Sequence, residues 1–221
     1  VGSEMCIRDS IRDAELAIQK KEPDFSIAKL DYDDPETYKM LSRGETEGVF
    51  QLESSGMKQV LVGLQPQNLE DVIALISLYR PGPMKFIPSY IENRRHPEKI
   101  TYRHPRLSKI LDVTYGCIIY QEQVMRIFRE LAGYSLGRAD IVRRAMSKKK
   151  HKVMEEERKY FVHGLKRADG TVEIEGCVAR GVDERTAEII YDEMESFASY
   201  AFNKSHAAAY AVVAYLSLIH I

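Results

Sequence analysis

The sequence predicts a mainly α fold with one small β-hairpin. Two observations carry the helical part: apolar residues recur at near-helical spacing in several segments, and helix-capping residues precede those segments. A third observation gives the hairpin, because Asp169-Gly170 is a turn signal and the apolar residues Val172 and Ile174 alternate after it. We therefore expect a multi-helix protein with a hairpin insertion at about 166–178.

Each helix has its own signal in the chain. Residues 11–20 fit a short helix. Asp34 is an N-cap before Pro35, and the helix that they launch should end at Gly44. A further helix fits 54–64. The remaining helices are expected at 69–80, 88–95, 120–132, 136–146, 152–165 and 184–197, and from 205 onward.

The helix at 69–80 is expected to lie in the core. Asn68 caps its start, and Pro81-Gly82-Pro83 ends it because proline cannot continue a helix. Its buried face is formed by Leu69, Val72, Ile73, Ile76 and Leu78.

Composition limits the classes of protein to consider. The 221 residues are 44% hydrophobic and 29% charged, enough for one large or two small domains, and the net charge of −1 excludes a uniformly basic nucleic-acid coat. Three scattered cysteines, Cys6, Cys117 and Cys177, exclude a disulfide framework and a CxxC metal site, so a cytoplasmic location is expected. The longest apolar run, 207–221, is too short to predict a membrane span.

Both ends of the chain look foreign to the fold. Residues 1–10 lack helical or strand periodicity, which predicts a non-native leader. The apolar helix after 205 runs into residues 216–221 without a stop signal, which predicts a truncated or non-native tail. We expect the chain to be a fragment.

A basic run at 141–152 is the sharpest chemical signal. It carries six cations and no acid, whereas the rest of the chain is net acidic. Arg144 and Lys148 share one face of a helix, a spacing that suits binding of phosphate oxygens. The alternative is a solvated face in which Asp140 pairs with Arg143 or Arg144.

The segment FNKSH, residues 202–206, is a second candidate anion site. Asn203 or Ser205 caps a helix whose free N–H groups could hold an anion beside Lys204 and His206. Phe202 offers a face on which a base could stack. The alternative is an ordinary capped helix with a surface lysine.

A third basic region, 80–106, interleaves cations with tyrosines and suits either a nucleic-acid backbone or a solvated face. Gly-rich phosphate loops, HExxH and Cys/His clusters are missing from the sequence. The acids Asp31, Asp33 and Asp34 could hold a magnesium ion, but next to Pro35 a helix start is favoured.

Five ordered motifs carry a family resemblance: GVFQLESSGMK (48–58), LISLYRPGPM (75–84), YGCIIYQEQVM (115–125), ADIVRRAMSKKK (139–150) and FASYAFNKSHAAAYAVVAY (197–215). Together they resemble the catalytic alpha subunit of bacterial DNA polymerase III, the C-family replicative polymerase. The resemblance implies that residues 11–215 are its helical fingers domain, which receives the incoming deoxynucleotide.

The resemblance also implies site residues. The nucleotide-binding candidates are Arg143, Arg144, Lys148, Lys204, His206, Phe202, Lys58 and Arg80. The DNA-binding candidates are Lys149, Lys150, Lys152, Arg94 and Arg95.

No catalytic or metal-binding residue is expected in this chain. The family's chemistry uses Mg²⁺ held by palm carboxylates, which lie upstream, and Asp9 does not match their motif. The implied partners are primer-template DNA, deoxynucleoside triphosphates and, through regions outside this chain, a sliding clamp and other replisome subunits. The chain alone is expected to be inactive.

Two other classes stay open. One is a non-catalytic helical module that contacts only backbone phosphates, and the other is a protein-interaction piece whose charges are solvated. A polymerase fingers domain should bind a deoxynucleoside triphosphate, whereas a module that contacts only the backbone should not discriminate. Nucleic-acid affinity that falls steeply with salt would distinguish either of these from a protein-interaction piece.

Overall fold

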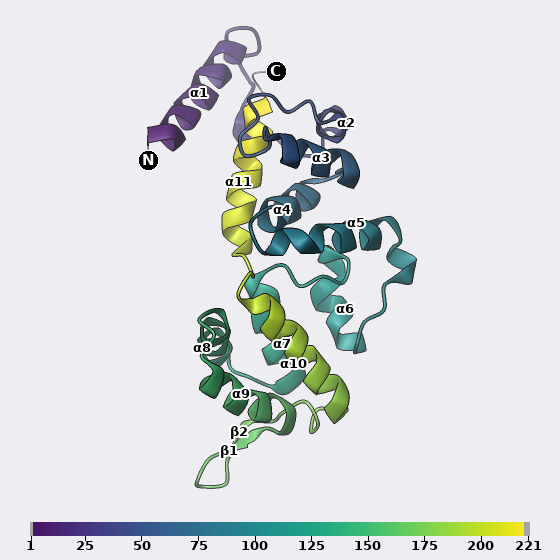
Figure 1. The fold of residues 1–221 in the computed structure, drawn as a ribbon. Coiled ribbons are helices and arrows are strands. Elements are labelled where there is room, and N and C mark those ends of the chain that lie inside the picture. The colour runs from purple at the N-terminus through teal and green to yellow at the C-terminus, as the bar shows by residue number, and fades with distance from the viewer. Residues whose placement is uncertain (1, 219–221) are drawn as a thin grey trace. The chain divides into compact units, whose positions relative to one another are not determined.

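A computed structural model describes residues 2–218, with side chains described from residue 9. Two compact units make up the chain: a terminal unit, formed by residues 1–79 and 205–221, and a central unit, formed by residues 80–204. The mainly α prediction is confirmed, since helices and one hairpin make up the regular structure of the described residues (Figure 1).

The terminal unit is helical. Its helices are α1 (Gly2–Gln19), α2 (Pro35–Arg43), α3 (Ser55–Leu64), α4 (Leu69–Leu78) and nearly all of α11 (Lys204–Ser217), with a 3₁₀ turn at Ile27–Lys29. Every residue from 71 to 78 is buried, so α4 is the core helix that its sequence predicts. The side chains of α11 pack within this unit: the Tyr215 ring meets Tyr32 edge-on at 5.3 Å, and Phe50 lies 5.3 Å from Tyr210 between ring centres.

Local capping explains where these helices begin. The Asp34 carboxylate accepts the N–H groups of Glu36 and Thr37, Ser54 accepts that of Met57, and Asn68 accepts that of Asp71. Gly44 ends α2 in the left-handed conformation at φ 72°. These starts and this stop are as predicted.

The central unit contains the hairpin and the remaining helices. They are α5 (Ile87–Arg95), α6 (Pro105–Leu111), α7 (Gln121–Ala132), α8 (Leu136–Ser147), α9 (His151–His163), β1 (Leu165–Lys166), β2 (Val172–Ile174) and α10 (Glu184–Ala198). Three 3₁₀ turns lie at Pro83–Phe86, Pro97–Lys99 and Asp112–Thr114. Helices α7 to α10 pack against one another.

An aromatic cluster fills the space among these helices. Phe128 of α7, Phe161 of α9 and Tyr191 of α10 are fully buried, and the ring of Phe161 meets that of Phe128 edge-on at 5.2 Å. Tyr134 packs on Phe128 at 5.0 Å. Edge-to-face aromatic packing of this kind adds to the stabilisation from burial alone.

The hairpin prediction is also confirmed. β1 and β2 pair antiparallel, with Leu165 opposite Ile174. The Asp169 carboxylate accepts the Thr171 N–H at 2.9 Å in the turn, as short polar side chains in turns do.

Two helices, α1 and α6, differ most from expectation. Helix α1 begins at Gly2 rather than at residue 11, because no Pro or Gly interrupts 3–19 and each added residue gains a backbone hydrogen bond. Helix α6 was not expected, although Pro105 stands at its first position and the His104 side chain caps it. Of the predicted leader and tail, residues 1 and 219–221 lie outside the described residues. No helix within 2–218 combines the length and apolar composition that crossing a membrane requires.

Candidate functional site

The basic run lies at the junction of α8 and α9. Arg143 and Arg144 are in the last turns of α8, Lys148 follows its end, and Lys149 turns the chain at φ 50° before α9 begins. Lys148, Lys149, Lys150 and Lys152 are all exposed, and among the described residues no carboxylate forms an ion pair with them. An exposed cationic loop results.

Asp140 pairs with both arginines of the run. Its Oδ1 lies 2.7 Å from Nη2 of Arg143, and its Oδ2 lies 2.8 Å from Nε of Arg144. The hydrogen bond from Arg143 is the main cause that holds the pKa of Asp140 below its usual value. The Arg143 side chain is only 13% exposed, whereas that of Arg144 is 67% exposed. Arg144 is thus the arginine that solvent and ligands can reach.

The second candidate segment is tied to the start of α7. The N–H of Phe202 donates to the carbonyl of Ile119 at 3.0 Å, and the N–H of Gln121 donates to the carbonyl of Phe202 at 2.9 Å. The Glu122 carboxylate accepts the backbone N–H of Lys204, with 3.1 Å from that nitrogen to Oε2. A carboxylate of the chain itself therefore holds one of the N–H groups that the sequence offered to an external anion.

Arg80 and Lys204 lie over aromatic rings. The guanidinium carbon of Arg80 is 4.2 Å from the centre of the Phe202 ring, and Nζ of Lys204 is 5.4 Å from that of the Tyr120 ring. Burial lowers the pKa of Arg80. Arg80 also donates from Nη2 to the carbonyl of Tyr200 at 2.8 Å, so it supports the segment that carries Phe202.

A hydrogen bond joins the basic run to the end of α10, which precedes the second candidate segment. The Ser147 hydroxyl, at the end of α8, donates to the carbonyl of Ala198 at the end of α10 at 2.9 Å. From Ala198 the chain needs only a few residues to reach Phe202 and Lys204. The structure thus brings the end of α8, in the middle of the basic run, next to the end of α10, which leads into the second segment.

The other predicted residues belong to the terminal unit or to α5. Lys58 and His206 belong to the terminal unit, where Lys58 forms an ion pair with Glu47 and the His206 ring lies 4.4 Å from the ring of Tyr210. The hydrogen bond from Lys58 lowers the pKa of Glu47. Arg94 and Arg95 stand in the last turn of α5, apart from the basic run in sequence.

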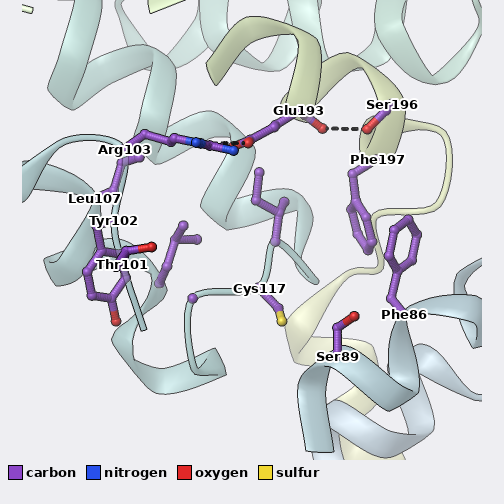
Figure 2. A pocket seen from close by; sticks show the side chains of 13 residues that line it. Phe86, Ser89, Thr101, Tyr102, Arg103, Leu107, Cys117, Glu193, Ser196 and Phe197 are labelled. Atoms are coloured by element: carbon purple, nitrogen blue, oxygen red, sulfur yellow. Dashed lines mark hydrogen bonds and ion pairs between the residues drawn. The ribbon is translucent and has the colours of Figure 1, made fainter. Parts of the chain in front are cut away.

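A pocket of about 340 Å³ in the central unit was missed by the sequence reasoning (Figure 2). Phe86 and Phe197 form one wall, with 4.9 Å between ring centres, and Arg103 pairs with Glu193 at 3.0 Å along an edge. The Cys117 thiol faces the pocket, and burial raises its pKa to about 11. No predicted site residue lines this pocket, and no local signal marks it because separate segments contribute its walls.

A wider depression of about 570 Å³ includes Lys204. Lys109 of α6 and Arg126 of α7 line it too, together with Asp112. Arg126 is partly neutralised by Glu130 at 2.9 Å. Only Lys204 among these cations was picked out from the sequence.

The described residues form no cluster of side chains that could bind a metal ion. Within residues 2–218 no three or more His, Cys, Asp or Glu side chains converge. Of the acids before Pro35, Asp34 caps α2 and Asp31 accepts the N–H of Asp33 at 3.2 Å. These carboxylates serve a helix start, and the residues present do not fit a catalytic Mg²⁺.

Comparisons with known proteins agree with the motif pattern. The family described as "Bacterial DNA polymerase III alpha subunit finger domain" matches residues 8–169. Proteins named "DNA polymerase III subunit alpha" are 48% identical in Thermus aquaticus and 50% identical in Treponema pallidum, over 89% and 86% of this chain. One from Borreliella burgdorferi is 44% identical over 93%. The matches span only 16%, 15% and 17% of these relatives.

Proposed function

The chain belongs to the family of bacterial DNA polymerase III alpha subunit finger domains, and from this membership we propose that it binds nucleotide and primer-template for a replicative DNA-directed DNA polymerase. The incoming deoxynucleoside triphosphate and the DNA are its proposed ligands. The sliding clamp, other replisome subunits and the cytoplasmic location belong to the same proposal for the longer protein.

The observation that carries the proposal is the exposed cationic loop after α8. A triphosphate and a DNA backbone both present closely spaced anionic oxygens, which Arg and Lys bind with charge-assisted hydrogen bonds. Arg144 and Lys148 are four residues apart and exposed, and so they suit the triphosphate. Lys149, Lys150 and Lys152 suit backbone phosphates.

Lys204 and Phe202 extend the same proposal. The link from Ser147 to Ala198 supports a shared site, since it ties α8 to the end of the helix that leads into Phe202. In this site Lys204 supplies a further cation and Phe202 an apolar wall. Arg143, which is mostly buried against Asp140, would hold the geometry of the site.

The chain's contribution to the reaction is binding and orientation. Phosphoryl transfer depends on in-line positioning and on charge stabilisation, and cationic side chains in the fingers can serve both. The Mg²⁺ chemistry of the parent enzyme would belong to carboxylates outside this chain. We therefore expect no primer extension by the chain alone.

The second candidate function is that of a non-catalytic module that binds only the backbone phosphates of DNA. The pairing of Asp140 with both arginines favours it, because it leaves the four lysines as the unpaired cations of the run. Such a module would bind DNA without regard to the nucleotide.

Fluorescence anisotropy of a labelled primer-template separates the two candidates. The full-length alpha subunit would be titrated over a salt series with and without the matching deoxynucleotide, next to Arg144→Glu/Lys148→Glu. We expect nucleotide-strengthened, salt-sensitive binding that this variant loses. Lys159→Glu/Lys166→Glu, the same charge change at other exposed sites, is the control. Binding that ignores the nucleotide would support the backbone module instead.

A further inference from the structure

Three consecutive side chains at the start of α7 organise the segment that carries Phe202 and Lys204. Gln121, Glu122 and Gln123 each bond a different group. They lie within the motif YGCIIYQEQVM (115–125), although the sequence predicted no role for them. Their partners lie about 80 residues away for the first two and within 13 residues for the third.

Gln121 holds the backbone that leads into the segment. Its Nε2 donates to the carbonyl of Ala201 at 3.1 Å, and its own N–H donates to the carbonyl of Phe202 at 2.9 Å. The backbone bond from Gln121 to Phe202 and that from Phe202 to Ile119 form a short parallel pairing. The path of the chain up to Phe202 is thereby set by backbone geometry.

The charged carboxylate of Glu122 holds Asn203 and Lys204, the two residues that follow Phe202. Oε1 accepts from Nδ2 of Asn203 at 3.0 Å, and Oε2 accepts from the N–H of Lys204 at 3.1 Å. Lys204 is the first residue of α11, whose leading N–H groups have no partner inside the helix. A carboxylate is favourable there because the N-terminus of a helix carries partial positive charge.

Gln123 makes the start of α7 rigid. It is buried, and its Oε1 accepts the N–H groups of Ile119 and Tyr120 at 2.8 and 2.9 Å. Its Nε2 donates to the hydroxyl of Thr114 at 2.7 Å. Glu122 therefore projects from a helix start at which the buried Gln123 amide is bonded through both its oxygen and its nitrogen, which restricts the position of the Glu122 carboxylate.

We propose that Glu122 is a positioning residue that fixes Asn203 and Lys204, so that Lys204 meets the phosphates of the incoming nucleotide. The inference rests on the proposed function of Lys204. Glu122 does not touch the nucleotide, and it acts through the backbone N–H that starts α11. Removing its carboxylate should let Lys204 leave its place over the Tyr120 ring.

Single-nucleotide incorporation by the full-length alpha subunit tests this. Glu122→Ala should raise KM for the deoxynucleotide about tenfold and lower kcat less than about threefold, as loss of binding geometry without loss of chemistry predicts. Glu122→Gln should stay within about threefold of the parent KM, because its amide oxygen still accepts the Lys204 N–H. Glu188→Ala removes an exposed carboxylate from α10 of the same unit and should leave KM unchanged.

A double variant distinguishes positioning from a general structural effect. If Glu122 acts through Lys204, Glu122→Ala/Lys204→Ala should have the KM of Lys204→Ala alone. Fold-changes that multiply, or an unchanged KM in Glu122→Ala, would overturn the inference and leave the proposed function standing. An unchanged KM in Lys204→Ala would instead overturn the role proposed for Lys204.

Asn203→Ala guards against a folding defect. It removes one of the bonds to Glu122 without changing the charge, and circular dichroism melting would report whether each variant is folded. We expect KM to rise about threefold for a single hydrogen bond of this kind. A folded Asn203→Ala variant with the parent KM would count against the inference.

Discussion

The guanidinium of Arg80 lies over the ring of Phe202, with 4.2 Å between its central carbon and the ring centre. The two residues are far apart in sequence, and the same guanidinium donates to the carbonyl of Tyr200. Gly82 lets Tyr200 approach, since a Cβ at this position would lie 2.4 Å from the Tyr200 ring. Arg80 is therefore part of the support of the candidate site.

Replacing Phe202 with Leu should destabilise the chain by about 1 kcal/mol, because an aliphatic side chain keeps apolar bulk but offers no ring face to the cation. Urea unfolding of Phe202→Leu, Arg80→Met and the double variant measures the coupling between the two residues. Additive losses would show that the stacking contributes nothing.

Glu157 is a buried carboxylate that depends on its partners. Nη2 of Arg138 lies 2.6 Å from its Oε1, and the Tyr134 hydroxyl donates to its Oε2 at 3.0 Å. Arg138→Met should cost about 3 kcal/mol of unfolding free energy, since the stranded carboxylate stays in the core.

The matched control is Arg167→Met. Its side chain is 62% exposed where it pairs with Glu173, and it should change stability by less than about 1 kcal/mol. Urea unfolding of both variants checks the pair of predictions, and equal losses would contradict them.

Removing the Asp140 carboxylate should strengthen DNA binding. In Asp140→Asn the side chains of Arg143 and Arg144 lose their anionic partner, so the slope of log affinity against log salt should steepen by about one unit per additional phosphate contact. Anisotropy over a salt series measures this slope. An unchanged slope would show that the arginines stay out of reach of DNA.

The pH dependence of this effect has a definite sign. The pKa of Asp140 is lowered, mainly by the hydrogen bond from Arg143. At every pH above the ordinary pKa of an aspartate the carboxylate is therefore ionised, and both ion pairs are present. The pairs are lost only as pH falls through the lowered pKa. From about pH 5 to about pH 9, Asp140 should add no pH dependence to DNA binding. A titration of parent affinity that differs from Asp140→Asn only in this range would contradict the assignment.

The two described cysteines should differ in reactivity. Burial raises the pKa of the Cys117 thiol to about 11 and that of Cys177 to about 12, so both are protonated near neutral pH and react slowly with iodoacetamide. Cys117 faces the pocket in Figure 2, whereas Cys177 is fully buried. Mass spectrometry of labelled peptides should find Cys117 modified first, faster as pH rises, and Cys177 only after unfolding. Equal labelling of the native chain would contradict this order.

Local chemistry explains why the helices could be read from the sequence. Asp34, Ser54, Asn68 and Asp183 each accept an N–H two or three residues ahead, so the signal and its partner lie within one turn. The hairpin turn at Asp169 is equally local. The basic run was visible because its six cations fall within twelve consecutive residues, and the family motifs because they are short and ordered.

The sequence by itself determined the mainly α class, most helix starts, the hairpin and the family, since each depends on neighbours along the chain. The tertiary structure decided what the candidate residues touch: Arg80 stacks on Phe202, Glu122 holds the start of α11, and Lys58 pairs with Glu47. It also formed the pocket around Cys117. Arg80 contacts a segment about 120 positions away in the sequence, and Glu122 contacts one about 80 positions away. Only folding brings such groups into contact, because an N-cap or a turn signal specifies its own local structure and no partner farther along the chain.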